Sequence, residues 1–166
     1  MNISWMNIKF LNPYFIRVFM GVILLAELTS CGGPPPPTPQ IFLQVVDVIV
    51  DPKANLDTAV AMDLIVVYED GLVDTLFKLS ANEYFSQKQQ IIRDNPGQID
   101  IWSWEVVPGQ VVPPRSITLS QYMSRGGIFF ANYLTPGDHR IRAGKESGAK
   151  ITLGPKDLSL QPFTPD

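Results

Sequence analysis

The only cysteine of the chain, Cys31, follows a short apolar run and three residues, Leu28-Thr29-Ser30. The run covers residues 18–26 and is preceded by a segment that carries basic residues and no acidic one. A spanning helix needs about 20 apolar residues, so this run is too short to cross a bilayer comfortably. Its length and its basic flank are typical of a secretory signal peptide. The folded part of the chain is therefore expected to begin after Cys31.

Leucine, two small residues and cysteine form the pattern of a bacterial lipobox. In such a pattern Leu28, Thr29 and Ser30 are recognised by the lipoprotein signal peptidase, and the Cys31 thiol accepts a diacylglycerol before cleavage. We predict a lipoprotein signal peptide over residues 1–30, with a further N-acyl chain on the new N-terminus. Each buried CH₂ contributes about 0.8 kcal/mol, so several chains anchor durably. The alternative is an ordinary signal peptide, or an uncleaved anchor, with a cysteine there by chance.

Residues 31–39 are expected to be a tether, because two glycines are followed there by a proline-rich stretch. Proline favours an extended conformation of about 3.1 Å per residue, which would hold a domain away from the lipid surface. A ligand for a proline-recognition domain is the alternative. Gly32 stands where the inner-membrane retention rule of enteric bacteria requires aspartate. We therefore expect the outer membrane of a Gram-negative host, with the domain on the periplasmic face.

The composition limits what the folded part can be. A net charge of -3 gives no basic footprint for nucleic acid. With a single cysteine the chain cannot form an internal disulfide, so a domain outside the cytoplasm must rely on its apolar core. Fifteen prolines and twelve glycines favour many turns and short strands over long helices.

Hydrophobic patterning predicts about seven short strands. Residues 41–50 are apolar on both faces and rich in β-branched side chains, as in a strand covered on both sides. Residues 60–69 and 98–107 alternate, and residues 127–134 are again apolar on both faces. Further strands are expected over the following segments: residues 116–121, 151–153 and 158–160.

One helix is expected. Ser80-Ala81-Asn82-Glu83 is a capping box, and apolar residues follow it at helical spacing until residues 94–97 end the helix. Seven short strands with one inserted helix predict a mainly β fold, a two-sheet β-sandwich over residues 40–166. A partly open barrel is the next choice.

The residue types for catalysis are largely missing, and we expect no enzyme. His139 is the only histidine, so with Cys31 acylated the chain offers no His and Cys metal site and no metal or other cofactor is expected. No nucleophile elbow is present. Paired carboxylates such as Glu69-Asp70 could serve a glycosidase, but acids at a strand end before glycine are typical of turns. His139 lies in a polar turn and is expected to be solvated.

Four further residues are candidate binding groups. Trp102 and Trp104 share one face of a predicted strand and are expected in the core, although an exposed pair could stack on a sugar. Arg140 and Arg142 are two apart on a possible strand and would point the same way, towards an acidic partner or towards solvent.

The order of these features resembles the small outer-membrane lipoproteins of type VI secretion, the TssJ family. The matching pieces are the lipobox, the tether, a first strand ending in Asp51-Pro52, and segments 64–70, 76–85, 104–110 and 127–143. The resemblance implies a transthyretin-like β-sandwich with an extra helix. It also implies that the loop from Asp51 to Asp57, including Lys53 and Asn55, contacts the periplasmic part of an inner-membrane protein like TssM.

The function implied by this resemblance is structural: a lipid-anchored protein that recruits a periplasmic partner of a secretion complex to the outer membrane. Two other functions stay open from the residues. One is a periplasmic lipoprotein that binds a glycan or small ligand through the Trp102–Trp104 face. The other is an envelope hydrolase, which the scarcity of catalytic residue types disfavours.

Overall fold

A computed structural model describes residues 41–120 and 123–165 of the 166 residues. The predicted signal peptide, Cys31 and the tether lie outside the described residues. Within the described ranges no helix has the length and apolarity that crossing a membrane would require.

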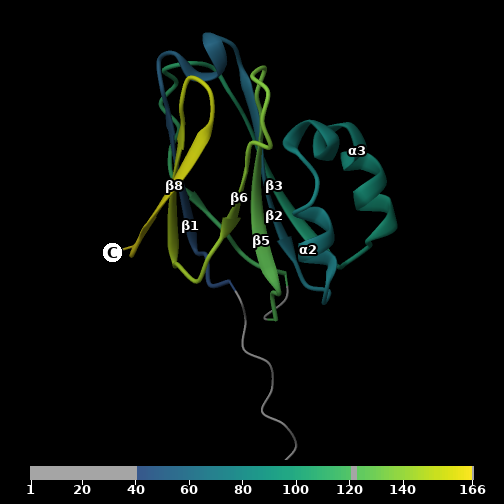
Figure 1. Cartoon of the computed structure of the whole chain (residues 1–166). Helices are drawn as coiled ribbons and strands as arrows, with labels where there is room; N and C mark the ends of the chain where they lie inside the picture. The colour runs from purple at the N-terminus through teal and green to yellow at the C-terminus, as the bar shows by residue number, and fades with distance from the viewer. Residues whose placement is uncertain (1–40, 121–122, 166) are drawn as a thin grey trace, which may run out of the picture. The chain divides into compact units, whose positions relative to one another are not determined.

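Two four-stranded sheets pack face to face (Figure 1). The first sheet has the order β4-β1-β7-β8, and the second has the order β3-β2-β5-β6. The predicted β-sandwich is thus confirmed, and the sheets stay separate rather than closing into a barrel. The strands are β1 (Val45–Val50), β2 (Val60–Val67), β3 (Ile99–Val106), β4 (Arg115–Ser116), β5 (Gly126–Asn132), β6 (Arg140–Ala143), β7 (Gly148–Leu153) and β8 (Leu158–Phe163).

The first strand departs from its prediction. β1 begins at Val45 and buries only alternate residues, Val46, Val48 and Val50, whereas Ile49 is 46% exposed. The prediction that both faces are covered is wrong, because among residues 41–120 and 123–165 no helix packs on the outer face of the first sheet. β1 pairs in parallel with β7 and antiparallel with β4. The strand predicted over residues 116–121 is reduced to the two residues of β4.

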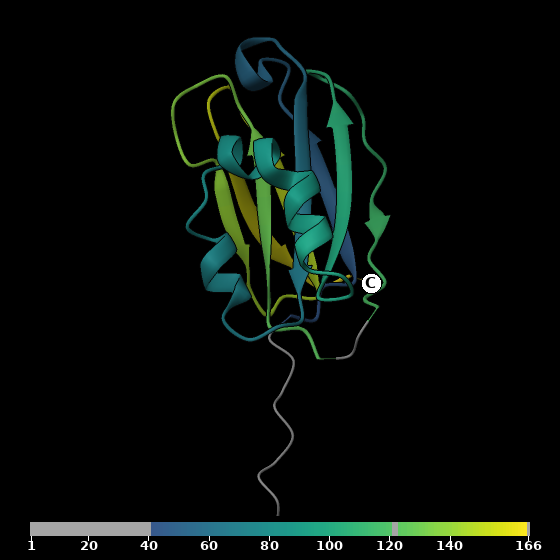
Figure 2. The same cartoon turned by 90° about the vertical axis from the view of Figure 1, so that its right-hand side faces the viewer.

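The second sheet is covered on both faces at its centre. Alternate residues of β2, such as Met62 and Leu64, enter the core between the sheets, while Ile65 and Val67 pack under two helices. β5 is buried on both faces in the same way, as its sequence predicted. Figure 2 shows the helices lying across the outer face of this sheet.

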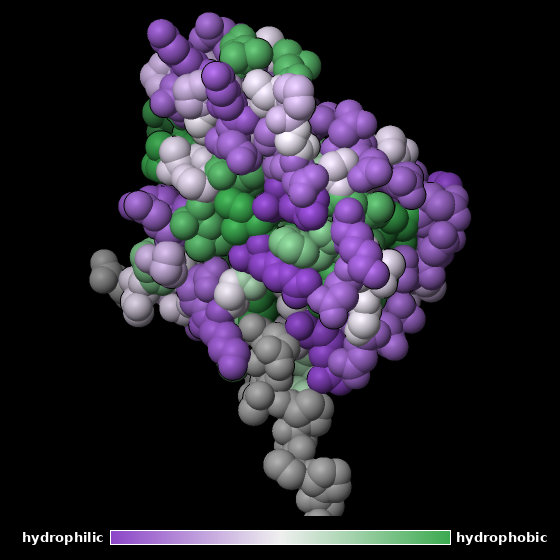
Figure 3. All heavy atoms as spheres, in the orientation of Figure 1, coloured by the Kyte–Doolittle hydropathy of each residue, from purple (hydrophilic) through white to green (hydrophobic). Residues whose placement is uncertain are grey.

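Two α-helices cover that face, α2 (Leu72–Leu76) and α3 (Ala81–Asp94). α3 is the predicted helix, and Figure 3 shows its outer side, at the right, covered mainly by hydrophilic residues. α2 was not predicted. A single turn starting after Gly71, which has a φ of +78°, is too short to give a helical repeat.

A polar cluster beneath α3 joins that helix to the sheet. Asp63 of β2 is 1% exposed and accepts a hydrogen bond of 2.5 Å from the Tyr84 hydroxyl. The Lys88 ammonium lies 2.7 Å from the same carboxylate oxygen and donates to Ser103 Oγ at 3.0 Å. Burial, together with Asp63, raises the pKa of Tyr84 above its ordinary range, so this hydroxyl remains a donor. Buried polar groups of this kind are stable only when paired.

The capping box of α3 is confirmed. The Glu83 N–H donates to Ser80 Oγ at 3.3 Å, and Glu83 Oε2 accepts from the Ser80 N–H at 2.8 Å. Hydrogen bonds from the Ser80 backbone and hydroxyl lower the pKa of Glu83. Its contribution to stability is therefore present at neutral pH and is lost as the pH falls through this lowered pKa.

Replacing Ser80 with alanine should lower the free energy of unfolding by about 1 kcal/mol, because one amide of the first helical turn loses its acceptor. Urea unfolding at neutral pH measures this loss. Ser86→Ala on the exposed side of α3 is the matched control and should cost less. Equal losses for the two variants would show that the cap contributes nothing specific.

Candidate interaction surface

Four loops meet at the end of the sandwich opposite to Ile41, and we call this the distal end (Figure 1). They are the loop of residues 51–59, which contains the short helix η2 (Ala54–Leu56), and the loops of residues 107–112, 133–139 and 154–157. The Gly109 N–H donates to Asp51 O, and the amides of Asn55 and Leu56 donate to Gly154 and Pro155 carbonyls. Hydrogen bonds between loops thus fix the shape of this surface.

Asn55 is the central residue of the distal end. It is 2% exposed, its Nδ2 donates to Ala59 O at 2.8 Å, and its Oδ1 accepts from the Leu134 N–H at 2.6 Å. Its φ of +48° lies in the left-handed region, which asparagine tolerates better than most residues. The Asn55 side chain therefore forms its hydrogen bonds within the domain and supports the loop.

Replacing Asn55 with alanine should lower the free energy of unfolding by about 2 kcal/mol, because a buried amide loses its acceptor and a left-handed backbone loses a tolerant residue. Thermal or urea unfolding provides the measurement. Asn55→Gly also loses these hydrogen bonds, but glycine adopts the left-handed backbone without strain. It should therefore lower the free energy of unfolding less than Asn55→Ala does. If both variants unfold like the wild type, Asn55 does not organise the loop.

Asp51 and Lys53, the other two residues predicted to bind a partner, lie at the start of the same loop. The Lys53 N–H donates to Asp51 Oδ1 at 2.7 Å, and the Lys53 side chain is exposed. Leu56 is 51% exposed beside them, and Figure 3 shows hydrophobic residues on the surface at this end. A partner-binding role for Asp51, Lys53 and Asn55 stays a prediction.

His139 differs from its prediction as a solvated residue. It is 7% exposed and stacks beside Tyr133, with ring centroids 4.9 Å apart. Its Nδ1 lies 3.0 Å from Asp157 Oδ1 and its Nε2 lies 2.7 Å from Thr135 O. The ring thus joins two distal loops. Because both nitrogens are engaged within the domain, His139 holds the loops together and faces no open site.

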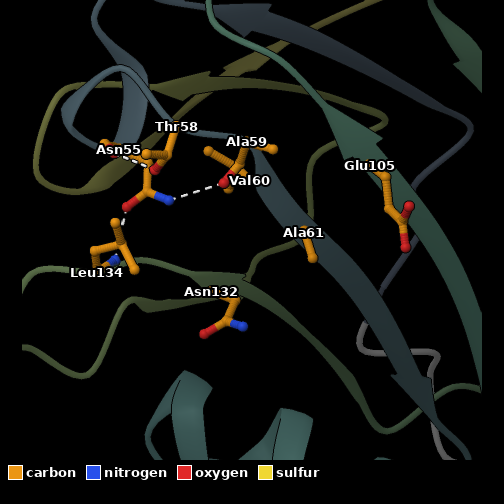
Figure 4. A pocket seen from close by; sticks show the side chains of 8 residues that line it. All are labelled: Asn55, Thr58, Ala59, Val60, Ala61, Glu105, Asn132 and Leu134. Atoms are coloured by element: carbon orange, nitrogen blue, oxygen red, sulfur yellow. Dashed lines mark hydrogen bonds between the residues drawn. The ribbon is translucent and has the colours of Figure 1, made fainter.

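A hollow of about 450 Å³ opens beside the 51–59 loop, on the helix side of the second sheet (Figure 4). Its floor includes Ala61, and a helix lies below it in the view. No local pattern in the sequence indicated this hollow. Strand register could have done so, because Ala61 lies opposite Glu105 on β3 and Asn132 on β5. The lining residues are Asn55, Thr58, Ala59, Val60, Ala61, Glu105, Asn132 and Leu134.

The tryptophans are core residues, as predicted. Trp104 is 8% exposed, Trp102 is partly buried against the same cluster, and the Arg115 guanidinium stacks 5.3 Å from the Trp104 ring. An exposed stacking platform for a sugar is therefore not formed by this pair.

Arg140 and Arg142 point the same way, as predicted for residues two apart on a strand. Both guanidinium groups lie over the Phe77 ring, at 4.9 and 4.3 Å from its centroid. Arg142 pairs with Asp74 at 2.6 Å and Arg140 with Asp138 at 2.8 Å. These arginines secure α2 and its following turn to the sheet.

Metal-ligating side chains do not gather in groups of three or more anywhere in residues 41–120 and 123–165. Glu69 and Asp70, the paired carboxylates considered above, are exposed at the end of β2, and Asp70 forms an ion pair with Arg125.

The fold is similar to that of two solved proteins. One is the type VI secretion lipoprotein TssJ1 from Pseudomonas aeruginosa, with a TM-score of 0.55 and 16% identity over 78% of this chain and 100% of that chain. The chain has the TssJ fold. The other is Serratia marcescens Lip, described as a membrane-bound component of the type VI secretion system, with a TM-score of 0.53. Its identity is also 16%, over 75% of this chain and 98% of Lip.

The resemblance to TssJ noted in the sequence is thus confirmed at the level of the fold. No family model matches the sequence, and a search of curated proteins gives no match.

Proposed function

We propose that this chain is a lipid-anchored component of a type VI secretion envelope complex, which uses its distal end to hold a periplasmic partner near the outer membrane. The observation that carries the proposal is the match of the whole TssJ1 chain to 78% of this one. The second match, Lip, is itself described as membrane-bound.

The arrangement of the domain supports this role. The predicted acyl chains on Cys31 would connect to Ile41 through ten residues, a reach of about 30 Å if extended. The chain enters the described domain at Ile41, and the 51–59 loop lies at the opposite end (Figure 1). An anchor at one end and exposed, hydrogen-bonded loops at the other suit a protein that bridges a membrane and a partner.

Isolation of the acylated chain from its own cell membranes in mild detergent, followed by mass spectrometry, tests the proposal. We expect the periplasmic domain of an inner-membrane secretion protein to be recovered. A Lys53→Glu, Leu56→Asp double variant changes only exposed side chains of the distal loop and should lose this protein. Lys145→Glu, in the turn before β7, is the control and should retain it. Equal recovery by both variants would contradict the role assigned to the distal end.

A further inference from the structure

We infer that the hollow beside Ala61 receives an arginine side chain of the periplasmic partner. This inference rests on the proposed function, because it names the chemistry with which the distal end would recognise that partner. It concerns a surface next to the 51–59 loop rather than the loop residues predicted from the sequence.

Strand register creates the hollow. Glu105, Ala61 and Asn132 form a row across β3, β2 and β5. Neighbouring strands lie about 4.8 Å apart, so the outer two residues are about 9.5 Å apart at the backbone with only a methyl group between them. Figure 4 shows Ala61 between the longer polar side chains of Glu105 and Asn132. A small residue between two long ones leaves room for a side chain from outside.

The Glu105 carboxylate and the Asn132 amide of this row are available to bind a side chain from outside. Glu105 and Asn132 are both exposed, and among the described residues the Glu105 carboxylate has no ion pair and the Asn132 amide has no hydrogen bond. Among the described residues that line the hollow, Glu105 is the only charged one, and none is a lysine or arginine. The hollow therefore offers one unneutralised negative charge and a second acceptor, the Asn132 amide oxygen.

A guanidinium group fits these acceptors better than an ammonium does. Its five N–H donors point outwards in one plane, so it can donate towards the Glu105 carboxylate on one side and towards the Asn132 oxygen on the other. A lysine ammonium is a compact point charge and is less suited to reach both acceptors at once. The methylene groups of arginine would lie over Ala59, Ala61 and the 68% exposed Leu134.

The openness of the hollow favours a protein side chain over a free small molecule. Small-molecule sites bury most of their ligand, but here Thr58, Glu105, Asn132 and Leu134 are all exposed. Asn55 and Thr58 line the hollow and belong to the 51–59 loop as well. A partner that covers the loop would therefore also close the hollow.

The test uses the full acylated chain in detergent micelles with ¹³C-labelled alanine methyl groups. The probe is the peptide acetyl-Gly-Arg-Gly-amide, compared with the same peptide containing neutral citrulline or lysine. We expect the arginine peptide to shift the Ala59 and Ala61 methyl signals saturably, while the buried Ala143 signal stays unchanged. Glu105→Gln should weaken the apparent affinity about fivefold, the upper range for an exposed ion pair. Ala61→Leu, which fills the hollow, should abolish the shift of the remaining Ala59 methyl signal.

Equal responses to arginine and citrulline, an unchanged Ala61 signal, or an unaltered affinity in Glu105→Gln would overturn the inference. An equal response to lysine would overturn the choice of arginine. These failures are distinguishable from failure of the proposed function. If Glu105→Gln still recovers the partner from membranes as well as the wild type does, the function stands and the arginine site does not.

Discussion

Replacing Cys31 with serine should abolish acylation of the chain and leave its signal peptide uncleaved. The hydroxyl cannot accept the diacylglycerol through sulfur, and the lipoprotein peptidase does not cleave a precursor without it. The mature chain would depend on this acylation for its anchor, because each buried CH₂ of an acyl chain contributes about 0.8 kcal/mol. Metabolic labelling with radioactive palmitate measures the loss of acylation, and electrophoretic comparison of the precursor with the mature chain measures the loss of cleavage.

The control for this experiment is Ser30→Ala, which keeps a small residue before the cysteine and should be processed and labelled normally. A Cys31→Ser protein that is still matured at residue 31 and still sediments with membranes would refute the lipoprotein prediction. The alternatives, an ordinary signal peptide or an uncleaved anchor, would then be favoured. This outcome would also remove the anchored end on which the proposed function depends.

Replacing Asp63 with alanine should strongly destabilise the described domain. The variant leaves the buried Tyr84 hydroxyl without its acceptor and the Lys88 ammonium without its ion-pair partner. Removing one partner of a buried pair costs about 3 kcal/mol or more. Lys88 is partly exposed and can turn to water, so we expect a loss near the lower end. Urea unfolding, with an unchanged slope, measures the difference.

Asp63→Asn is the matched control, since its amide oxygen can still accept from Tyr84 while the charge is removed. It should lose less stability than Asp63→Ala. Tyr84→Phe removes the hydroxyl alone and should cost about 1 kcal/mol. If Asp63→Ala unfolds within 0.5 kcal/mol of the wild type, the cluster under α3 does not hold that helix to the sheet.

The sequence predicted helices and strands correctly where their own residues form a recognisable local pattern. The Ser80–Glu83 capping box identified the start of α3, and the alternation around Trp102 and Trp104 identified a strand with its core face. The apolar stretch at residues 127–134 correctly indicated β5, a strand buried on both faces. These features depend on residues that are only a few positions apart, so they can be recognised in a single sequence.

Features that depend on distant pairing were missed. His139 is buried because Asp157 and Thr135 engage its two ring nitrogens, and the 18-residue separation from Asp157 leaves no local pattern. Ile49 is exposed because no described helix covers the outer face of its sheet, and the apolar sequence of the strand could not reveal this. The hollow beside Ala61 forms only when β3, β2 and β5 pair in the correct register, which no local pattern shows. Of the features in this paragraph, only the left-handed backbone at Asn55 had a local indication in the sequence, because asparagine in a short loop often adopts that conformation.

The proposed bridging role makes a claim about orientation that chemical crosslinking can test directly. Lysines mark both ends of the domain: Lys53 and Lys156 lie in the distal loops, whereas Lys145 lies in the turn before β7. Amine-reactive crosslinking of the acylated chain in intact envelopes, followed by peptide mapping, should join Lys53 or Lys156 to the periplasmic domain of an inner-membrane protein. Crosslinks to such a protein through Lys145, with none through Lys53 or Lys156, would contradict the account.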